Sequence, residues 1–174
     1  MSKAATSDQV ALAVIVRGIE APCQVSRVSE VLAWIVPLLG HAPGTGVVDL
    51  RCPCPTLPAE IERLVGDLRD RRSIVKRLVP GRRGRMARLD LTTHDGREEF
   101  CLLAPWSDDA RIVAGRKHLL AVAGGTRSFW VELPKEKADD LGVWFRRRGL
   151  GRVIDMDAWA AEQPPPERRS RRRR

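Results

Sequence analysis

The chain has 174 residues, enough to bury the core of one medium-sized domain. Hydrophobic residues make up 43% of it, a proportion that excludes wholesale disorder. The formal net charge of +9 favours partners with acidic surfaces, among which nucleic acid is the foremost class.

The positive charge is concentrated at the C-terminus. From Gln163 onward the chain holds six arginines and one glutamate, a net charge of +5, so all preceding residues together carry only +4. Arginine also far outnumbers lysine, and arginine is favoured where phosphates are bound in a bidentate manner. A GC-rich genome explains the overall excess of arginine equally well, but it does not explain the clustering.

The first 50 residues predict a strand, a helix and a second strand. The continuous apolar run Val10–Val16 is typical of a strand that is buried on both faces. A helix is expected over Ser26–Leu39, with Pro37 bending or ending its last turn. A short strand over Val47–Leu50 completes the strand–helix–strand order of a crossover unit.

A second helix and a basic segment are expected next. The helix covers Pro58–Arg72, with Thr56 as its N-cap, and its apolar pattern can continue to Leu78. The segment Lys76–Arg88 combines basic residues with one proline and two glycines, which predicts a mobile basic loop.

A β-hairpin is expected over Ala87–Ala104. Asp95-Gly96 at its centre is a strong signal for a two-residue type I′ turn. Pairing outward from this turn produces one apolar face and one largely polar face, so the hairpin should cover a core on one side only. Pro105–Arg116 is then expected to be a connection.

A second hairpin is expected around Gly124-Gly125. Two short apolar runs flank this pair, which suits a turn that requires positive φ. Pairing outward from the turn sets Leu120 opposite Phe129. It also sets Lys117 opposite Glu132, a favourable cross-strand charge pair.

The last predicted helix begins at Pro134. Its final turn holds Arg146–Arg148 and Gly149 lies just past its end, both of which are typical of a helix C-terminus. A last strand is expected over Arg152–Met156. The Pro- and Arg-rich composition after Trp159 predicts a disordered tail.

The cysteines and histidines are the one set of residues that suggests a metal site. Structural zinc sites use paired C-x₂₋₄-C motifs, whereas Cys52-Pro53-Cys54 is a single pair with C-x-C spacing. We therefore predict no metal site and no cofactor. Free thiols are favoured over a disulfide framework for Cys23, Cys52, Cys54 and Cys101.

No established catalytic motif is present. The chain lacks a nucleophile elbow, a Walker phosphate-binding loop and a dinucleotide fingerprint. Asp49 and Asp90 permit a metal-dependent hydrolase hypothesis, which requires the two carboxylates to meet in one cleft. We predict no catalytic residue, and the balance is against an enzyme.

The basic clusters are the strongest candidates for a binding site. Arg146–Arg148 is explained by its position, because cations favour a helix C-terminus. The loop and the tail have no such explanation, and Arg-rich segments attract phosphates in a salt-dependent manner. Neither segment contains an aromatic residue, and the tryptophans are expected to belong to the core. The predicted nucleic-acid-binding residues are Lys76, Arg77, Arg82, Arg83, Arg85, Arg88, Arg168, Arg169, Arg171, Arg172, Arg173 and Arg174.

The predicted fold is a single α+β domain over residues 9–159 with a disordered Pro/Arg-rich tail over residues 160–174. A two-layer arrangement is expected, in which about three helices cover a mixed or mostly antiparallel sheet of six or seven strands. A small half-barrel closed by the last helix is the alternative.

The function favoured by the sequence is non-catalytic binding of nucleic acid, DNA or RNA, through its phosphate backbone and without sequence specificity. The alternative is a protein–protein interaction or structural assembly module, whose basic tail contacts an acidic protein surface. No secretory signal is evident and no apolar run approaches the length of about 20 residues that spans a bilayer. We therefore expect a cytoplasmic, nucleoid or nuclear protein that is neither secreted nor membrane-bound.

Overall fold

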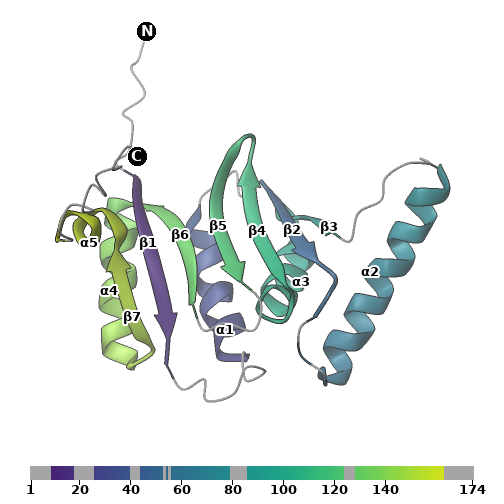
Figure 1. The fold of residues 1–174 in the computed structure, drawn as a ribbon, viewed down its shortest axis with the longest axis horizontal. Helices are drawn as coiled ribbons and strands as arrows, with labels where there is room; N and C mark the ends of the chain where they lie inside the picture. The colour runs from purple at the N-terminus through teal and green to yellow at the C-terminus, as the bar shows by residue number, and fades with distance from the viewer. Residues whose placement is uncertain are drawn as a thin grey trace, which may run out of the picture.

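The computed structural model describes residues 9–17, 26–39, 44–52, 54, 56–78, 86–123 and 128–162. These residues form one seven-stranded sheet, five α-helices and two short 3-10 helices (Figure 1). The elements in chain order are β1 (Gln9–Val16), α1 (Ser26–Ile35), the 3-10 helix η1 (Val36–Leu39), β2 (Thr45–Asp49), α2 (Ala59–Leu78), β3 (Met86–Asp90), α3 (His94–Leu103), the 3-10 helix η2 (Ala104–Trp106), β4 (Asp109–Ala114), β5 (Lys117–Ala123), β6 (Ser128–Pro134), α4 (Lys135–Arg148), β7 (Gly151–Asp155) and α5 (Met156–Glu162).

The strands lie in the order β3-β2-β4-β5-β6-β1-β7, and every neighbouring pair is antiparallel. This alternation makes β1 and β2 run in the same direction with three strands between them, so the chain crosses the sheet through α1. The predicted crossover is confirmed in direction, although its two strands are not adjacent. The α+β class is also confirmed, with more helices than the three expected.

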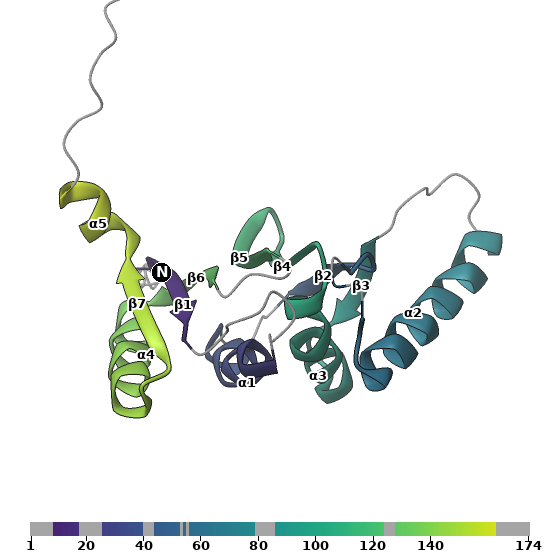
Figure 2. The ribbon, with the colours of Figure 1, turned by 60° about the horizontal axis from the view of Figure 1, so that its bottom comes forward.

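The two faces of the sheet differ in what covers them. Side chains alternate between the faces along each strand, and one set packs under α1, α3 and α4 (Figure 2). This set forms the centre of the core, and its largest fully buried members on the strands are Val14, Val16, Ile112, Leu120 and Leu133. The side chains of the opposite set are mostly half-buried, and we call this side the open face. Among the described elements, α5 lies on this side, at the β7 edge (Figure 2).

The first helix ends where the sequence predicts. α1 stops at Ile35, and the chain continues as a 3-10 helix over Val36–Leu39. Pro37 lacks the backbone N–H that an α-helix would use at this position, which accounts for the change. The second helix runs to Leu78, as its apolar pattern allows.

The predicted hairpin over Ala87–Ala104 is wrong. β3 is followed directly by α3, which Thr93 caps by accepting a hydrogen bond from the Gly96 backbone N–H at 3.0 Å. Gly96 does not adopt positive φ; instead, an added Cβ would lie 2.1 Å from the Asp90 carbonyl oxygen. The glycine is thus needed for a close approach of helix and strand, and not for a turn. Its spacing to Phe100 and Leu103, which are also buried, is helical.

The segment expected to be a connection contains β4. This strand pairs with both β2 and β5 and therefore joins the two halves of the sheet. Ala110 and Ile112 are its buried residues, and Gly115, with φ of 61°, begins the turn to β5. A six-residue strand with only two buried residues has a weak alternating pattern, which is why the sequence did not indicate it.

The hairpin strands β5 and β6 are confirmed, but their predicted register is wrong by two residues. Leu120 lies opposite Val131, and not opposite Phe129. A shift of two residues keeps every side chain on the same face, so all three remain buried. The predicted ion pair between Lys117 and Glu132 also forms, at 2.5 Å, now between diagonal positions.

The helix α4 and the strand β7 follow the sequence, whereas α5 was not predicted and includes residues 160–162 of the expected disordered tail. α4 begins directly after Pro134, and Gly149 ends it with φ of 62° and a backbone N–H that donates to the carbonyl of Arg146. The short strand expected after this helix is β7. Residues 163–174, which make up most of the predicted tail, lie outside the described residues.

Candidate functional site

Three of the predicted nucleic-acid-binding residues lie in described elements. Arg88 is exposed on β3, the strand at one edge of the sheet. Lys76 and Arg77 belong to the last turns of α2, which stands beyond this same edge (Figures 1 and 2). The predicted residues outside the described part of the chain are Arg82, Arg83, Arg85, Arg168, Arg169, Arg171, Arg172, Arg173 and Arg174.

Two arginines attach α2 to the rest of the domain. Arg69 donates a hydrogen bond from Nη2 to the carbonyl oxygen of Leu50, at 2.9 Å. Arg71 forms an ion pair with Glu99 of α3, with 2.9 Å between Nη2 and Oε1. These two contacts fix the middle of α2 beside Leu50 and α3.

The basic last turn of α4 lies at the opposite side of the molecule. α4 covers β7 and β1, whereas Arg88 is on β3 at the far edge (Figure 1). Six inter-strand spacings separate the edges, which is about 29 Å at about 4.8 Å each. Arg148 lies over the Trp144 ring, 5.5 Å from its centroid, so it has a packing partner within its own helix. Arg146–Arg148 and the β3 edge therefore do not share one basic face.

A single row of side chains crosses the open face from edge to edge. Successive strand pairings place one residue of each strand in this row. From β7 to β3 its members are Ile154, Ala13, Trp130, Ala121, Arg111, Val47 and Arg88. Trp130 thus lies between two alanines, and Arg111 and Arg88 follow on the same side.

A hollow of about 410 Å³ opens next to Trp130 on this row. Asp108, Asp109 and Met156 of α5 also line it. Arg111 forms an ion pair with Asp109, yet its Nε is buried and has no hydrogen-bond partner among the described residues. Neither Trp130 nor Arg111 was predicted as a binding residue, because the row depends on the order of the strands. The one local signal was the two-residue alternation along β6.

The acids at the end of β2 have a structural role. Asp49 is buried, and it accepts hydrogen bonds from the backbone N–H of Arg51 at 3.0 Å and from its guanidinium at 2.6 Å. Arg51 also contacts Asp108, with 3.3 Å between Nε and Oδ2. The hydrogen bond to Asp49, with the charges of both acids, raises the pKa of Arg51.

The hydrolase hypothesis requires Asp49 and Asp90 to meet, and they do not. Asp49 pairs with Met86 at one end of the β2–β3 ladder, whereas Asp90 pairs with Thr45 at the other, about 13 Å along the strands. Asp90 instead accepts two hydrogen bonds from Thr92, which lower the pKa of its carboxyl. No group of three potential metal ligands occurs within the described ranges.

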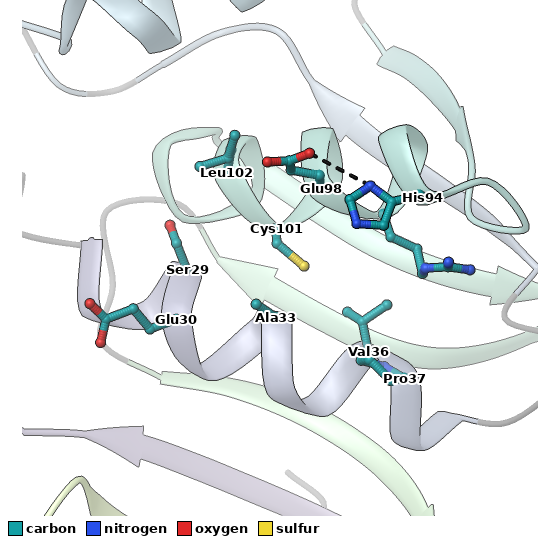
Figure 3. Close-up of a pocket in the computed structure, with 10 residues that line it drawn as sticks. Ser29, Glu30, Ala33, Val36, Pro37, His94, Glu98, Cys101 and Leu102 are labelled. Carbon is teal, nitrogen blue, oxygen red and sulfur yellow. Dashed lines mark ion pairs between the residues drawn. The ribbon is translucent and has the colours of Figure 1, made fainter.

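A second cavity, of about 540 Å³, lies between α1 and α3 on the helical side of the domain (Figure 3). Its walls include Ala33, Pro37 and Leu102, and Glu30 and Glu98 flank them. The cavity is open to solvent and lined mainly by apolar side chains.

Cys101 points into this cavity without forming a catalytic pair (Figure 3). Burial raises the pKa of its thiol to about 12, so it carries no thiolate at neutral pH. His94 contacts Asp95 and Glu98 at 3.8 Å, both carboxylates of its own helix. The cavity can accommodate a ligand, but it does not supply an activated nucleophile.

The prediction of free thiols holds for two of the described cysteines and is wrong for the third. Cys52 and Cys101 are free, whereas Cys54 is disulfide-bonded. Cys23 lies outside the described residues. Disulfide formation requires two Cα atoms within about 7 Å, a proximity that cysteine spacing in the sequence does not reveal.

Comparison of the chain with protein-family models, with curated proteins and with solved structures found no match. No helix in the described part of the chain is long and apolar enough to cross a membrane.

Proposed function

We propose that this protein binds nucleic acid, DNA or RNA, through the phosphate backbone and without reading its sequence. The observation that carries the proposal is the separation of charge along the chain. The segment Lys76–Arg88 holds six cationic residues and no acid, a net charge of +6. The tail after Gln163 adds +5, so the remaining residues together are net −2. All of the excess positive charge thus belongs to two segments.

The described residues of the first segment support the proposal. Lys76 and Arg77 lie in the last turn of α2 and Arg88 lies on β3, at one edge of the sheet. A nucleic acid bound at this edge would meet Arg88. Each phosphate neutralised by an arginine releases condensed counterions, which is the driving force of such binding.

Charge-removal variants in a salt series test the proposal. Fluorescence anisotropy with the full chain should give a linear fall of log K with log salt concentration. The double variant Arg82→Ser/Arg83→Ser should reduce this slope by about 1.4 to 1.8, because each cation contributes about 0.7 to 0.9. Truncation after Gln163 should reduce it further.

The control is Arg146→Ser/Arg147→Ser, which removes the same charge from two exposed residues of α4. This control should reduce the salt slope by less than half of the reduction expected for Arg82→Ser/Arg83→Ser. Negligible binding of DNA and RNA by the full chain at low salt would refute the proposal. Equal slopes for all four proteins would refute it as well.

A protein-interaction module is the second candidate function, and the cavity between α1 and α3 favours it. Its mainly apolar walls suit an apolar segment of a partner protein. This candidate predicts a stable oligomer or a co-purifying protein that persists after tail truncation. A strictly monomeric mass from light scattering, with no bound protein, would count against it.

The proposal also implies where the protein acts. A nucleic-acid-binding protein of this kind belongs in the cytoplasm, the nucleoid or the nucleus, and imaging of a tagged full-length chain would test this.

A further inference from the structure

We infer that the open face binds single-stranded nucleic acid, with one base stacked on Trp130 and the neighbouring backbone held by Arg111. This inference rests on the proposed function and deepens it. It specifies an unpaired strand as the ligand and adds Trp130 and Arg111, which belong to neither basic segment, as its central contacts.

The surroundings of Trp130 suit a base. Its cross-strand neighbours on both sides are alanines, Ala13 of β1 and Ala121 of β5. Their methyl groups leave the indole only half-buried beside the hollow of about 410 Å³. Aromatic side chains on a sheet surface are stacking platforms for unpaired bases, since every base has a π-face.

The cations of the row lie where the backbone of a stacked strand would run. Arg111 is two strands from Trp130 and Arg88 is two strands further, so about 9 to 10 Å separates each from the next. Arg111 contacts Asp109 with one terminal nitrogen, and 38% of its side chain is exposed. A phosphate or sugar oxygen can accept a further hydrogen bond from the exposed guanidinium.

The acids of the hollow fit a base better than they fit a phosphate. Asp108 and Asp109 line the hollow, and Arg51 and Arg111 neutralise them through ion pairs. An anion would gain little there, whereas a neutral base carries no charge that the two carboxylates would repel. The charge pattern thus predicts a base in the hollow and phosphates along the row of arginines.

The row also reaches the β3 edge of the sheet. It begins at Ile154 on β7 and ends at Arg88 on β3. A single strand lying across the sheet would contact Trp130, Arg111 and Arg88 in turn. A duplex cannot do this, because its bases are stacked on each other and not available to an indole.

The test compares the binding of labelled single-stranded oligonucleotides and of the matching duplex at low salt. Oligonucleotides of about 12 nucleotides are suitable, because single-strand-binding folds cover sites of about this length. Trp130→Leu should weaken single-strand binding about tenfold, within the range measured for loss of one stacked base. Its salt slope should stay unchanged, because no charge is removed. Its duplex affinity should equal that of the unmodified chain.

Two further variants separate stacking from a loss of fold. Trp130→Phe keeps an aromatic face and should retain most of the single-strand affinity. Trp159→Leu removes the other tryptophan of this side, which is 48% exposed on α5 and does not line the hollow, and should bind as the unmodified chain does. Thermal unfolding of each variant confirms that the domain is intact.

The outcomes distinguish the inference from the proposed function. If Trp130→Leu binds single strands normally while Arg82→Ser/Arg83→Ser and the truncated chain lose affinity, the inference is wrong and the proposed function stands. If folded Trp130→Leu weakens single-strand and duplex binding equally, the inference is also wrong. If the unmodified chain binds neither form at low salt, both fail.

Discussion

The indole rings of Trp34 and Trp144 lie almost parallel, with their centroids 4.4 Å apart and 5° between their planes. Trp34 belongs to α1 and Trp144 to α4, two helices that cover the same face of the sheet. Phe145 meets Trp144 edge-on at 5.5 Å, and the guanidinium of Arg148 lies over the same indole. The helical layer is therefore held together at this point by aromatic stacking as well as by packing on the strands.

A double-mutant cycle should detect this stack. Trp34→Leu, Trp144→Leu and the double variant should give a coupling free energy of about 0.5 to 1.5 kcal/mol, because stacked aromatic pairs stabilise beyond their buried area. Urea unfolding measures each free energy. A coupling near zero would mean that the two rings contribute through burial alone.

Two glycine substitutions should change stability in opposite directions. Gly96→Ala should destabilise the fold by at least about 2 kcal/mol, because its Cβ would meet the rigid carbonyl of Asp90. Gly66→Ala is the matched control in α2, where an added Cβ meets nothing within 4 Å. It should stabilise the protein by about 0.5 to 1 kcal/mol, since alanine favours the helix. Thermal unfolding checks both signs, and a stable Gly96→Ala would contradict the close approach.

The thiol of Cys101 should be unreactive in the native state. Burial is the largest cause of its raised pKa, with a further contribution from Glu98, while Arg97 acts in the opposite direction. In the Cys52→Ala background, alkylation by iodoacetamide at pH 8 should be far slower in the native protein than in urea. Comparable rates in both states would contradict the buried position of the thiol.

The raised pKa of Cys101 also predicts that the stability of the protein depends on pH. The folded pKa of Cys101, about 12, lies above the ordinary value of 9.0, so the unfolded chain releases the proton first. The stabilising contribution is complete below about pH 9 and is lost as the pH rises towards 12. The stability difference between the unmodified chain and Cys101→Ala should therefore shrink over this window, as urea unfolding can measure. A constant difference would argue against the raised pKa.

Removing the carboxylate that Arg111 contacts should strengthen nucleic-acid binding. Asp109→Asn releases the guanidinium and should raise the single-strand affinity severalfold, with a salt slope steeper by about 0.7. Asp139→Asn is the control, because it makes the same charge change on α4, where Asp139 contacts Lys135. Equal gains for the two variants would mean that only the net charge matters, and that Arg111 has no specific role.

Local chemistry explains which elements were predictable. Three elements show their pattern over a short stretch of sequence. They are β1 through its apolar run, α2 through its amphipathic pattern, and α4 through its limits at Pro134 and Gly149. Prediction from local sequence was wrong at Asp95-Gly96, because the same residue types favour both a tight turn and a helix N-terminus. It failed also at β4, because a short strand with two buried residues leaves little periodic signal.

The candidate site also has one part that the sequence indicates and one part that only the structure shows. The accumulation of cationic residues in Lys76–Arg88 and after Gln163 is a property of composition and needs no structure. The row that contains Trp130 and Arg111 is different, because β6 and β4 become second neighbours only through the sheet order. No pattern within either strand indicates which residues of the other strand share its face and level.

The sequence by itself determined the α+β class, most of the helices and the concentration of positive charge in two segments, because helical periodicity, capping residues and net charge are short-range properties of the chain. Only the tertiary structure decided which strands are neighbours, which face of the sheet the helices cover and which side chains meet on the open face. These depend on the packing of segments far apart in the chain, and that packing is selected by burial of the whole core at once.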